Sequence, residues 1–146
     1  MALKFFLDTN IVVYAASARD EDDRKRLIAL EVLSEGGYAT SAQVHQEFYN
    51  TVTRKNDPPM DHLEALAWLS DLSRFKVVPI THQIVYEGAE FASRYQLSYW
   101  DGAIIAAAHA SGAREILSED LSDGQQYGDV RVINPFPGYT PKELRQ

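Results

Sequence analysis

The sequence predicts a three-layer α/β/α domain, with helices covering both faces of a central, mostly parallel sheet of four to five strands. Short apolar segments alternate with longer segments of helical periodicity along the 146 residues, which is typical of parallel strands joined by helices. This length suits one compact domain. We expect that domain to span residues 1–134 and a Pro-rich tail to cover 135–146.

In the first half of the chain, an apolar run at 3–8 indicates a buried strand, and helical spacing follows as far as Ser17. The acids at 20–23 precede three basic residues, an order that suits the start of a helix with a solvated face, and Gly36 ends that helix. A second strand at 38–40 leads to Ser41, a candidate N-cap. The helix that follows is expected to run towards Asn56.

The second half repeats the alternation. In order, we expect a helix over about 60–74, a strand at 76–80, a helix starting at Thr81, a small apolar helix at 100–111, a strand at 115–118 and a last strand at 130–133. The helix at 100–111 is so rich in alanine and isoleucine that it is expected to pack in the interior, and Trp100 is interpreted as a packing residue.

Composition narrows the chemistry available to the chain. It has no cysteine, which excludes disulfides, thiolate metal sites and cysteine nucleophiles, so a metal would be bound through oxygen or histidine. The net charge of −7 argues against binding nucleic acid by bulk electrostatics, but bound cations could reverse the sign locally. No signal peptide is recognised and no apolar run reaches the ~18 residues of a membrane span. We therefore expect a cytoplasmic protein without membrane contact.

Four carboxylates stand at boundaries of the expected elements: Asp8, Glu47, Asp101 and Asp120. Asp8 and Asp120 each follow a strand, and parallel sheets of this kind bind ligands beyond the carboxyl ends of their strands. If the four side chains converge, their ionised forms repel one another, so either some pKa values rise or a hard divalent cation is recruited. The sequence therefore predicts a candidate metal site.

Two of these acids also have ordinary structural explanations. Asp8 suits a helix N-cap, as Thr9 and Asn10 do, although its place after the first strand favours a functional role. Thr9 and Asn10 are then expected to orient Asp8 or to contact ligand oxygens. Glu47 would usually be solvated in the middle of a helix, but its spacing from Val44 brings it within reach of the crevice edge.

The other two acids lie near turns or helix ends. Asp101 would complement a helix dipole, yet the apolar helix behind it holds it at a defined place. Asp120 lies in a turn rich in serine, aspartate and glycine. It is preferred to its acidic neighbours because strand alternation directs Ser118 and Asp120 the same way. Asp123 is left open as a secondary ligand.

Four stretches of the chain occur in a characteristic order and spacing: Phe6-Leu7-Asp8-Thr9-Asn10, Ser41 to Glu47, Tyr99-Trp100-Asp101 and Leu117-Ser118-Glu119-Asp120-Leu121. In these stretches the chain resembles the PIN-domain ribonucleases of the VapC toxin type. The resemblance covers roughly residues 3–134 and implies a PIN-like fold. Ser118 stands where that family often has threonine, which keeps the hydroxyl.

The resemblance implies a metal-dependent endoribonuclease, a hydrolase that leaves a 3′-hydroxyl and a 5′-phosphate, acting as the toxin of a type II toxin–antitoxin pair. Asp8, Asp101 and Asp120 are then expected to bind Mg²⁺ or Mn²⁺ as catalytic residues, with Glu47 completing the acidic site. Asn10 and Ser118 are expected to contribute hydrogen bonds to substrate.

The partners implied are an RNA substrate, a cognate antitoxin and a second copy in a homodimer. The alternative is a non-catalytic module that binds RNA or protein in the same pocket. A phosphatase with an aspartyl nucleophile is disfavoured because Asn10 stands where a second acid is usual, and a nucleotide-binding domain is disfavoured because no glycine-rich loop follows the first strand.

Overall fold

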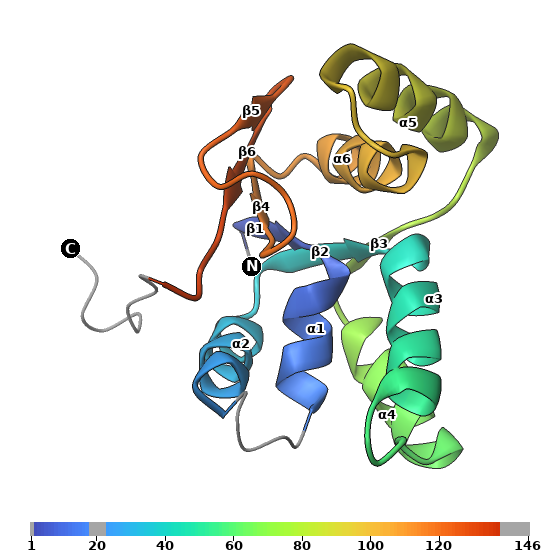
Figure 1. Ribbon diagram of the computed structural model, residues 1–146, viewed down its shortest axis with the longest axis vertical. Helices are drawn as coiled ribbons and strands as arrows, with labels where there is room; N and C mark the ends of the chain where they lie inside the picture. Colours follow the sequence, from blue (N-terminus) through green and yellow to red (C-terminus); the bar gives the residue numbers. More distant parts are fainter. Residues whose placement is uncertain (1, 18–22, 138–146) are drawn as a thin grey trace.

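The computed structural model describes residues 2–17 and 23–137, and within them a six-stranded sheet forms the centre of the molecule (Figure 1). The strand order is β3-β2-β1-β4-β6-β5. All neighbouring strands run parallel except β5 and β6, which form an antiparallel pair. The strands are β1 (Phe5–Leu7), β2 (Tyr38–Ser41), β3 (Lys76–Val78), β4 (Glu115–Leu117), β5 (Gln126–Tyr127) and β6 (Val130–Ile133).

Helices cover the sheet on both sides, which confirms the three-layer α/β/α architecture. In Figure 1 the first four helices lie below the sheet, while α5 and α6 lie above it. The helices below the sheet are α1 (Thr9–Ala16), α2 (Asp23–Glu35), α3 (Ala42–Asn50) with its continuation η2 (Thr51–Lys55), and α4 (His62–Leu72); those above are α5 (His82–Tyr95) and α6 (Tyr99–Ser111).

Capping side chains fix where the helices at the carboxyl edge of the sheet begin. Asp8 caps α1 by accepting a hydrogen bond from the Thr9 amide, and Ser41 caps α3 by accepting one from the Val44 amide. Both caps satisfy helix N–H groups that have no partner within the helix. Each residue ends its strand or follows it directly, so the cap also sets where the next helix points.

The interior helix α6 behaves as its composition predicts. Its residues from Gly102 to Ala108 are all buried, and it packs against α5 at very short range. A Cβ at Gly102 would lie 2.3 Å from the carbonyl oxygen of Gly88, so only glycine permits this approach. The start of α6, which carries Asp101, is therefore held by the core.

Two features differ from the sequence-based expectations. The sheet has six strands and not four to five, because β5 is only two residues long and two residues show no periodicity. The helix that starts after Ser41 changes to π-helical geometry at Thr51. At the start of the expected tail, Phe136 is buried and packs edge to face on Tyr14, which is compatible with a tail that lies on the domain.

The expected acidic start of the second helix falls largely outside the described residues, as does most of the expected tail, residues 138–146. In the described part of the chain, every helix is too short or too polar to cross a bilayer.

Candidate active site

The topology places two of the candidate acids at one point of the sheet. The strand order reverses at β1, which lies between β2 on one side and β4 on the other. Asp8 directly follows β1, and Ser118 to Asp120 follow β4. Crevices at such reversal points are where open parallel sheets bind ligands.

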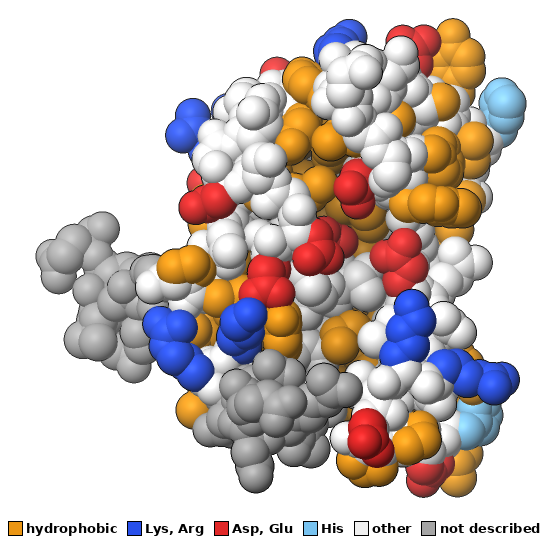
Figure 2. All heavy atoms as spheres, in the orientation of Figure 1, with side chains coloured by type: hydrophobic (Ala, Val, Ile, Leu, Met, Phe, Trp, Pro, Cys, Tyr) orange, Lys and Arg blue, Asp and Glu red, His pale blue; other side chains and the backbone are white. Residues whose placement is uncertain are grey.

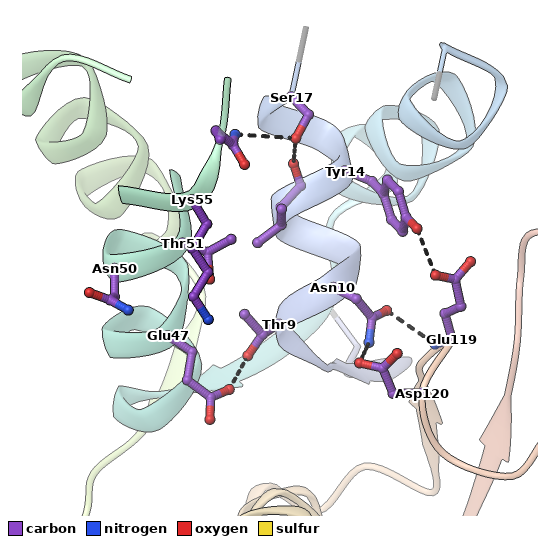
Figure 3. Close-up of a pocket in the computed structure, with 12 residues that line it drawn as sticks. Thr9, Asn10, Tyr14, Ser17, Glu47, Asn50, Thr51, Lys55, Glu119 and Asp120 are labelled. Atoms are coloured by element: carbon purple, nitrogen blue, oxygen red, sulfur yellow. Dashed lines mark hydrogen bonds between the residues drawn. The ribbon is translucent and has the colours of Figure 1, made fainter. Parts of the chain in front are cut away.

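A groove with a volume of about 580 Å³ opens at this point, between α1 on one side and α3 with η2 on the other. Figure 2 shows acidic side chains gathered around the hollow in the middle of this face, and Figure 3 shows the residues that line it. The groove is lined by Thr9, Asn10, Val13, Tyr14, Ser17, Glu47, Asn50, Thr51, Lys55, Asn56, Glu119 and Asp120.

Asp8 is the most deeply placed of the candidate acids, with 6% of its surface exposed. One carboxylate oxygen accepts the Thr9 amide at 2.7 Å and the other accepts the Ser118 hydroxyl at 2.7 Å. Burial, together with the smaller contributions of the Asp120 and Glu47 charges, raises the pKa of Asp8 from 3.8 to about 6 despite these hydrogen bonds. The carboxylate is therefore held rigidly in surroundings that disfavour its negative charge.

Asn10 connects Asp8 to Asp120. Its side-chain amide nitrogen lies 3.4 Å from an oxygen of Asp8, 3.4 Å from the Ser118 hydroxyl and 3.2 Å from an oxygen of Asp120. Its side-chain oxygen accepts the backbone amide of Glu119 at 3.1 Å, which fixes the orientation of the group. The partly positive N–H₂ group of Asn10 thus lies among three oxygens. These oxygens create a negative potential there, which also favours a cation.

Glu47 reaches the same region from α3. The Thr9 hydroxyl donates to one of its oxygens at 2.5 Å and the side chain of Gln43 donates to the other at 3.1 Å. Gln43 also donates to the backbone carbonyl of Trp100 at 3.2 Å and so links α3 to the start of α6. The expectation that Glu47 reaches the crevice edge is confirmed.

Asp101 and Asp120 complete the acidic region. Burial raises the pKa of Asp101, and the charges of Asp120 and Glu47 add to the effect, whereas a hydrogen bond with Ser98 opposes it. Asp120 is exposed at the mouth of the groove. The four acids thus share one electrostatic field although they come from four separate segments of the chain.

The side chains do not close into a preformed metal cage. Among the residues that the structure describes, no three histidine, cysteine or acidic side chains are placed together closely enough to hold a metal ion. The donor set still suits a hard divalent cation, because it consists of carboxylate oxygens, each with lone pairs left after the hydrogen bonds above. Burial is the main cause of the raised pKa values of Asp8 and Asp101, and a bound cation would also offset the smaller part that comes from the neighbouring acidic charges.

Two side chains lie differently from what the sequence suggested. Ser118 has no exposed surface, and its hydroxyl donates to Asp8 while accepting the amides of Asp120 and Leu121. Ser118 is therefore placed to orient Asp8, and it is too deeply buried to contact a substrate directly. The interpretation of Trp100 as a packing residue is wrong, because 65% of its surface is exposed.

The neighbouring acids of the last turn have other partners. Glu119 accepts hydrogen bonds from Lys25 and from the Tyr14 hydroxyl, and its pKa is lowered by these donors although burial opposes the shift. Asp123 accepts the backbone amide of Asn134 at 2.9 Å. Both contacts fasten the turn to the rest of the fold, which leaves Asp120 as the acid of this turn that is bridged to Asp8.

Sequence reasoning missed Gln43, which joins Glu47 to α6, and Lys55, which lines the groove. Gln43 lies one turn before Glu47 on the same helix, and this i, i+4 spacing was a usable signal. Lys55 gave no such signal because its orientation depends on the π-helical turn.

Fold and site together define an α/β protein with an acidic groove where the order of its parallel strands reverses. The sequence matches the model of the PIN domain family over residues 5–122. The chain belongs to the PIN domain family. A comparison with curated proteins gave no significant match.

Solved structures of similar fold include several toxin–antitoxin proteins. A toxin–antitoxin complex from Klebsiella pneumoniae is 19% identical with a TM-score of 0.68, over 91% of this chain and 98% of that one. The sarcin-ricin loop cleaving toxin VapC20 of Mycobacterium tuberculosis is 18% identical with a TM-score of 0.64, over 80% and 92%. VapBC2 of Rickettsia felis, bound to a DNA fragment from its promoter, is 19% identical with a TM-score of 0.62, over 90% and 98%. At these identities the likeness concerns the fold.

Proposed function

We propose that this PIN-domain protein is a divalent-metal-dependent endoribonuclease and the toxin of a type II toxin–antitoxin pair. The observation that carries the proposal is the buried Asp8 carboxylate. It directly follows the central strand β1, and burial, with smaller contributions from the charges of Asp120 and Glu47, raises its pKa to about 6. A buried acid with acidic neighbours disfavours folding with its charge intact, and carboxyl groups with pKa values shifted in this way cluster at functional sites.

In this proposal Asp8, Asp101 and Asp120 hold Mg²⁺ or Mn²⁺ through carboxylate oxygens. When bound, the cation supplies Lewis acidity and a positive charge for the phosphodiester. Ser118 and the Thr9 amide keep Asp8 in one orientation.

Glu47 is assigned to orienting the attacking water. Thr9 and Gln43 leave each of its carboxylate oxygens with further lone pairs for this purpose. Asn10 contacts both Asp8 and Asp120 and faces the groove. It is therefore assigned two roles: a hydrogen bond to the substrate, and fixing the positions of the two acids relative to each other. None of these side chains needs to act as a nucleophile.

The toxin assignment draws on the fold and on charge. The similar structures are described as toxins or toxin–antitoxin complexes, and one of them as cleaving the sarcin-ricin loop. An acidic groove in a chain of net charge −7 suits a basic antitoxin segment whose arginine would pair with the carboxylates. The homodimer implied by the resemblance and the cytoplasmic location expected from the sequence belong to the same proposal.

Induced expression in bacteria tests the proposal. Wild-type protein should arrest growth and produce new RNA fragments with 5′-phosphate ends, whereas Asp101→Asn should do neither at equal protein level. Asp123→Asn is the matched control, since it removes an equal charge from an exposed acid whose side chain accepts a hydrogen bond from the Asn134 backbone amide. Normal growth with intact RNA under wild-type expression would contradict the toxin proposal and favour the non-catalytic module.

A further inference from the structure

The wall of the groove opposite α1 contains a change of helical geometry. Helix α3 ends at Asn50 and the chain continues directly as the π-helix η2. The backbone amide of Asn56 donates to the Thr51 carbonyl at 3.0 Å, which is the five-residue spacing of a π-turn. Single π-turns within helices occur frequently at functional sites.

This change decides which basic residue faces the groove. An α-helix has about 3.6 residues per turn, so seven residues make about two turns, and an uninterrupted helix would align Arg54 with Glu47. A π-turn takes up one residue more and moves the alignment to Lys55. The structure agrees: Lys55 lines the groove, whereas Arg54 is exposed elsewhere on the same helix.

The wall that carries Lys55 is fastened on both sides. Val52 is fully buried, and its carbonyl accepts the amide of Met60 at 2.7 Å. The Asn56 side chain donates to the Ser17 hydroxyl at the end of α1, which ties the two walls together at this end of the groove. The position of Lys55 therefore follows from the packing of η2 and not from a loop.

Acidic and basic side chains both face the groove. Glu47, Glu119 and Asp120 are among the residues that line it. Lys55 enters the groove from the wall that also carries Asn50 and Thr51, and its side chain runs toward Thr9 and Glu47 (Figure 3). Within the described residues Lys55 has no hydrogen bond or ion pair, so its ammonium group is available to an anion.

We infer that Lys55 binds a phosphate of the RNA strand adjacent to the phosphate that is cleaved, with Asn50 and Thr51 as hydrogen-bond donors beside it. Eight residues separate Lys55 from Glu47, about 12 Å along a helix, and the length of the lysine side chain covers part of that distance. Lys55 is thus a positioning residue that fixes how the strand enters an otherwise acidic groove. This inference rests on the proposed ribonuclease function.

Steady-state cleavage of an RNA that the wild type cuts tests the inference, with Lys55→Gln, Lys55→Arg and Arg54→Gln compared at several salt concentrations. Arg54→Gln removes the same charge from the adjacent residue outside the groove. Lys55→Gln should raise KM about 5- to 10-fold and leave kcat within about 2-fold, as expected for a contact made equally in the ground and transition states. Its slope of log KM against log salt should fall by about 0.7, the loss of one phosphate contact on a single strand.

For Lys55→Arg, both KM and kcat should stay within about 2-fold of the wild-type values, and the same holds for Arg54→Gln. Equal effects of Lys55→Gln and Arg54→Gln would assign the effect to overall charge and overturn the inference while leaving the ribonuclease proposal standing. If the wild type cuts no RNA under any metal condition, the ribonuclease proposal fails and this inference fails with it.

Discussion

Replacing Asp8 by asparagine should make the protein more stable at neutral pH when no divalent cation is present. Burial, with help from Asp120 and Glu47, raises the pKa of Asp8 to about 6 in the folded protein, against 3.8 for the free side chain. The folded state therefore binds a proton more tightly than the unfolded state does. By linkage, stability falls as the pH rises from about 4 to about 6, and the loss stays constant above that range.

The size of the effect follows from the two pKa values. At about 1.4 kcal/mol per pH unit, the difference between 3.8 and about 6 corresponds to about 3 kcal/mol. Asparagine does not ionise, so its own hydrogen bonds change stability by an amount that is the same at every pH. The stability of Asp8→Asn minus that of wild type should therefore be about 2 to 3 kcal/mol more favourable at pH 7.5 than at pH 4.

Urea unfolding with a chelator present, at a series of pH values, measures this difference. The exposed acid Asp123 provides the control, because Asp123→Asn should show no comparable dependence on pH. A difference between Asp8→Asn and wild type that does not change with pH would refute the reasoning. Addition of Mg²⁺ should stabilise wild type and not Asp8→Asn, by about 2.7 kcal/mol at a concentration 100-fold above the Kd.

Three further substitutions test the supports of the site. Gly102→Ala would place a Cβ 2.3 Å from a carbonyl oxygen of α5, so it should destabilise the fold by about 3 kcal/mol and lower Tm by about 10 °C in a thermal melt. Ser118→Ala removes a hydrogen bond that favours the ionised Asp8, so the Asp8 pKa, followed by carboxyl NMR with a chelator present, should rise further. Thr9→Val removes the hydroxyl that orients Glu47 and should slow RNA cleavage on the order of 10-fold while leaving Tm nearly unchanged; an unchanged rate would show that Thr9 does not support catalysis.

The sequence predicts the parallel core of this fold because its signals are local and strong. The apolar run ending at Asp8, the N-cap at Ser41 and the end of the apolar helix at residue 111 all lie where the structure has element boundaries. The strand β5 escaped notice because it is too short to show alternation and forms only by pairing with β6.

The candidate site is predictable in outline for the same reason. Asp8 and Asp120 follow strands, and the topology of parallel sheets brings such positions to one edge. The roles of Ser118 and Trp100 could not be predicted, because burial of one and exposure of the other depend on which segments cover them. Lys55 depends on a π-turn that no residue type in η2 specifies, so its orientation is decided by tertiary packing.

The most direct test of the central claim is the cleavage of a mixed pool of structured RNAs by purified protein with Mg²⁺, with Mn²⁺ or with a chelator. We expect cleavage that requires a divalent cation, is lost in Asp101→Asn and persists in Asp123→Asn. Cleavage that continues with the chelator, or that survives in Asp101→Asn, would contradict the assignment of the acidic groove as a metal-dependent active site.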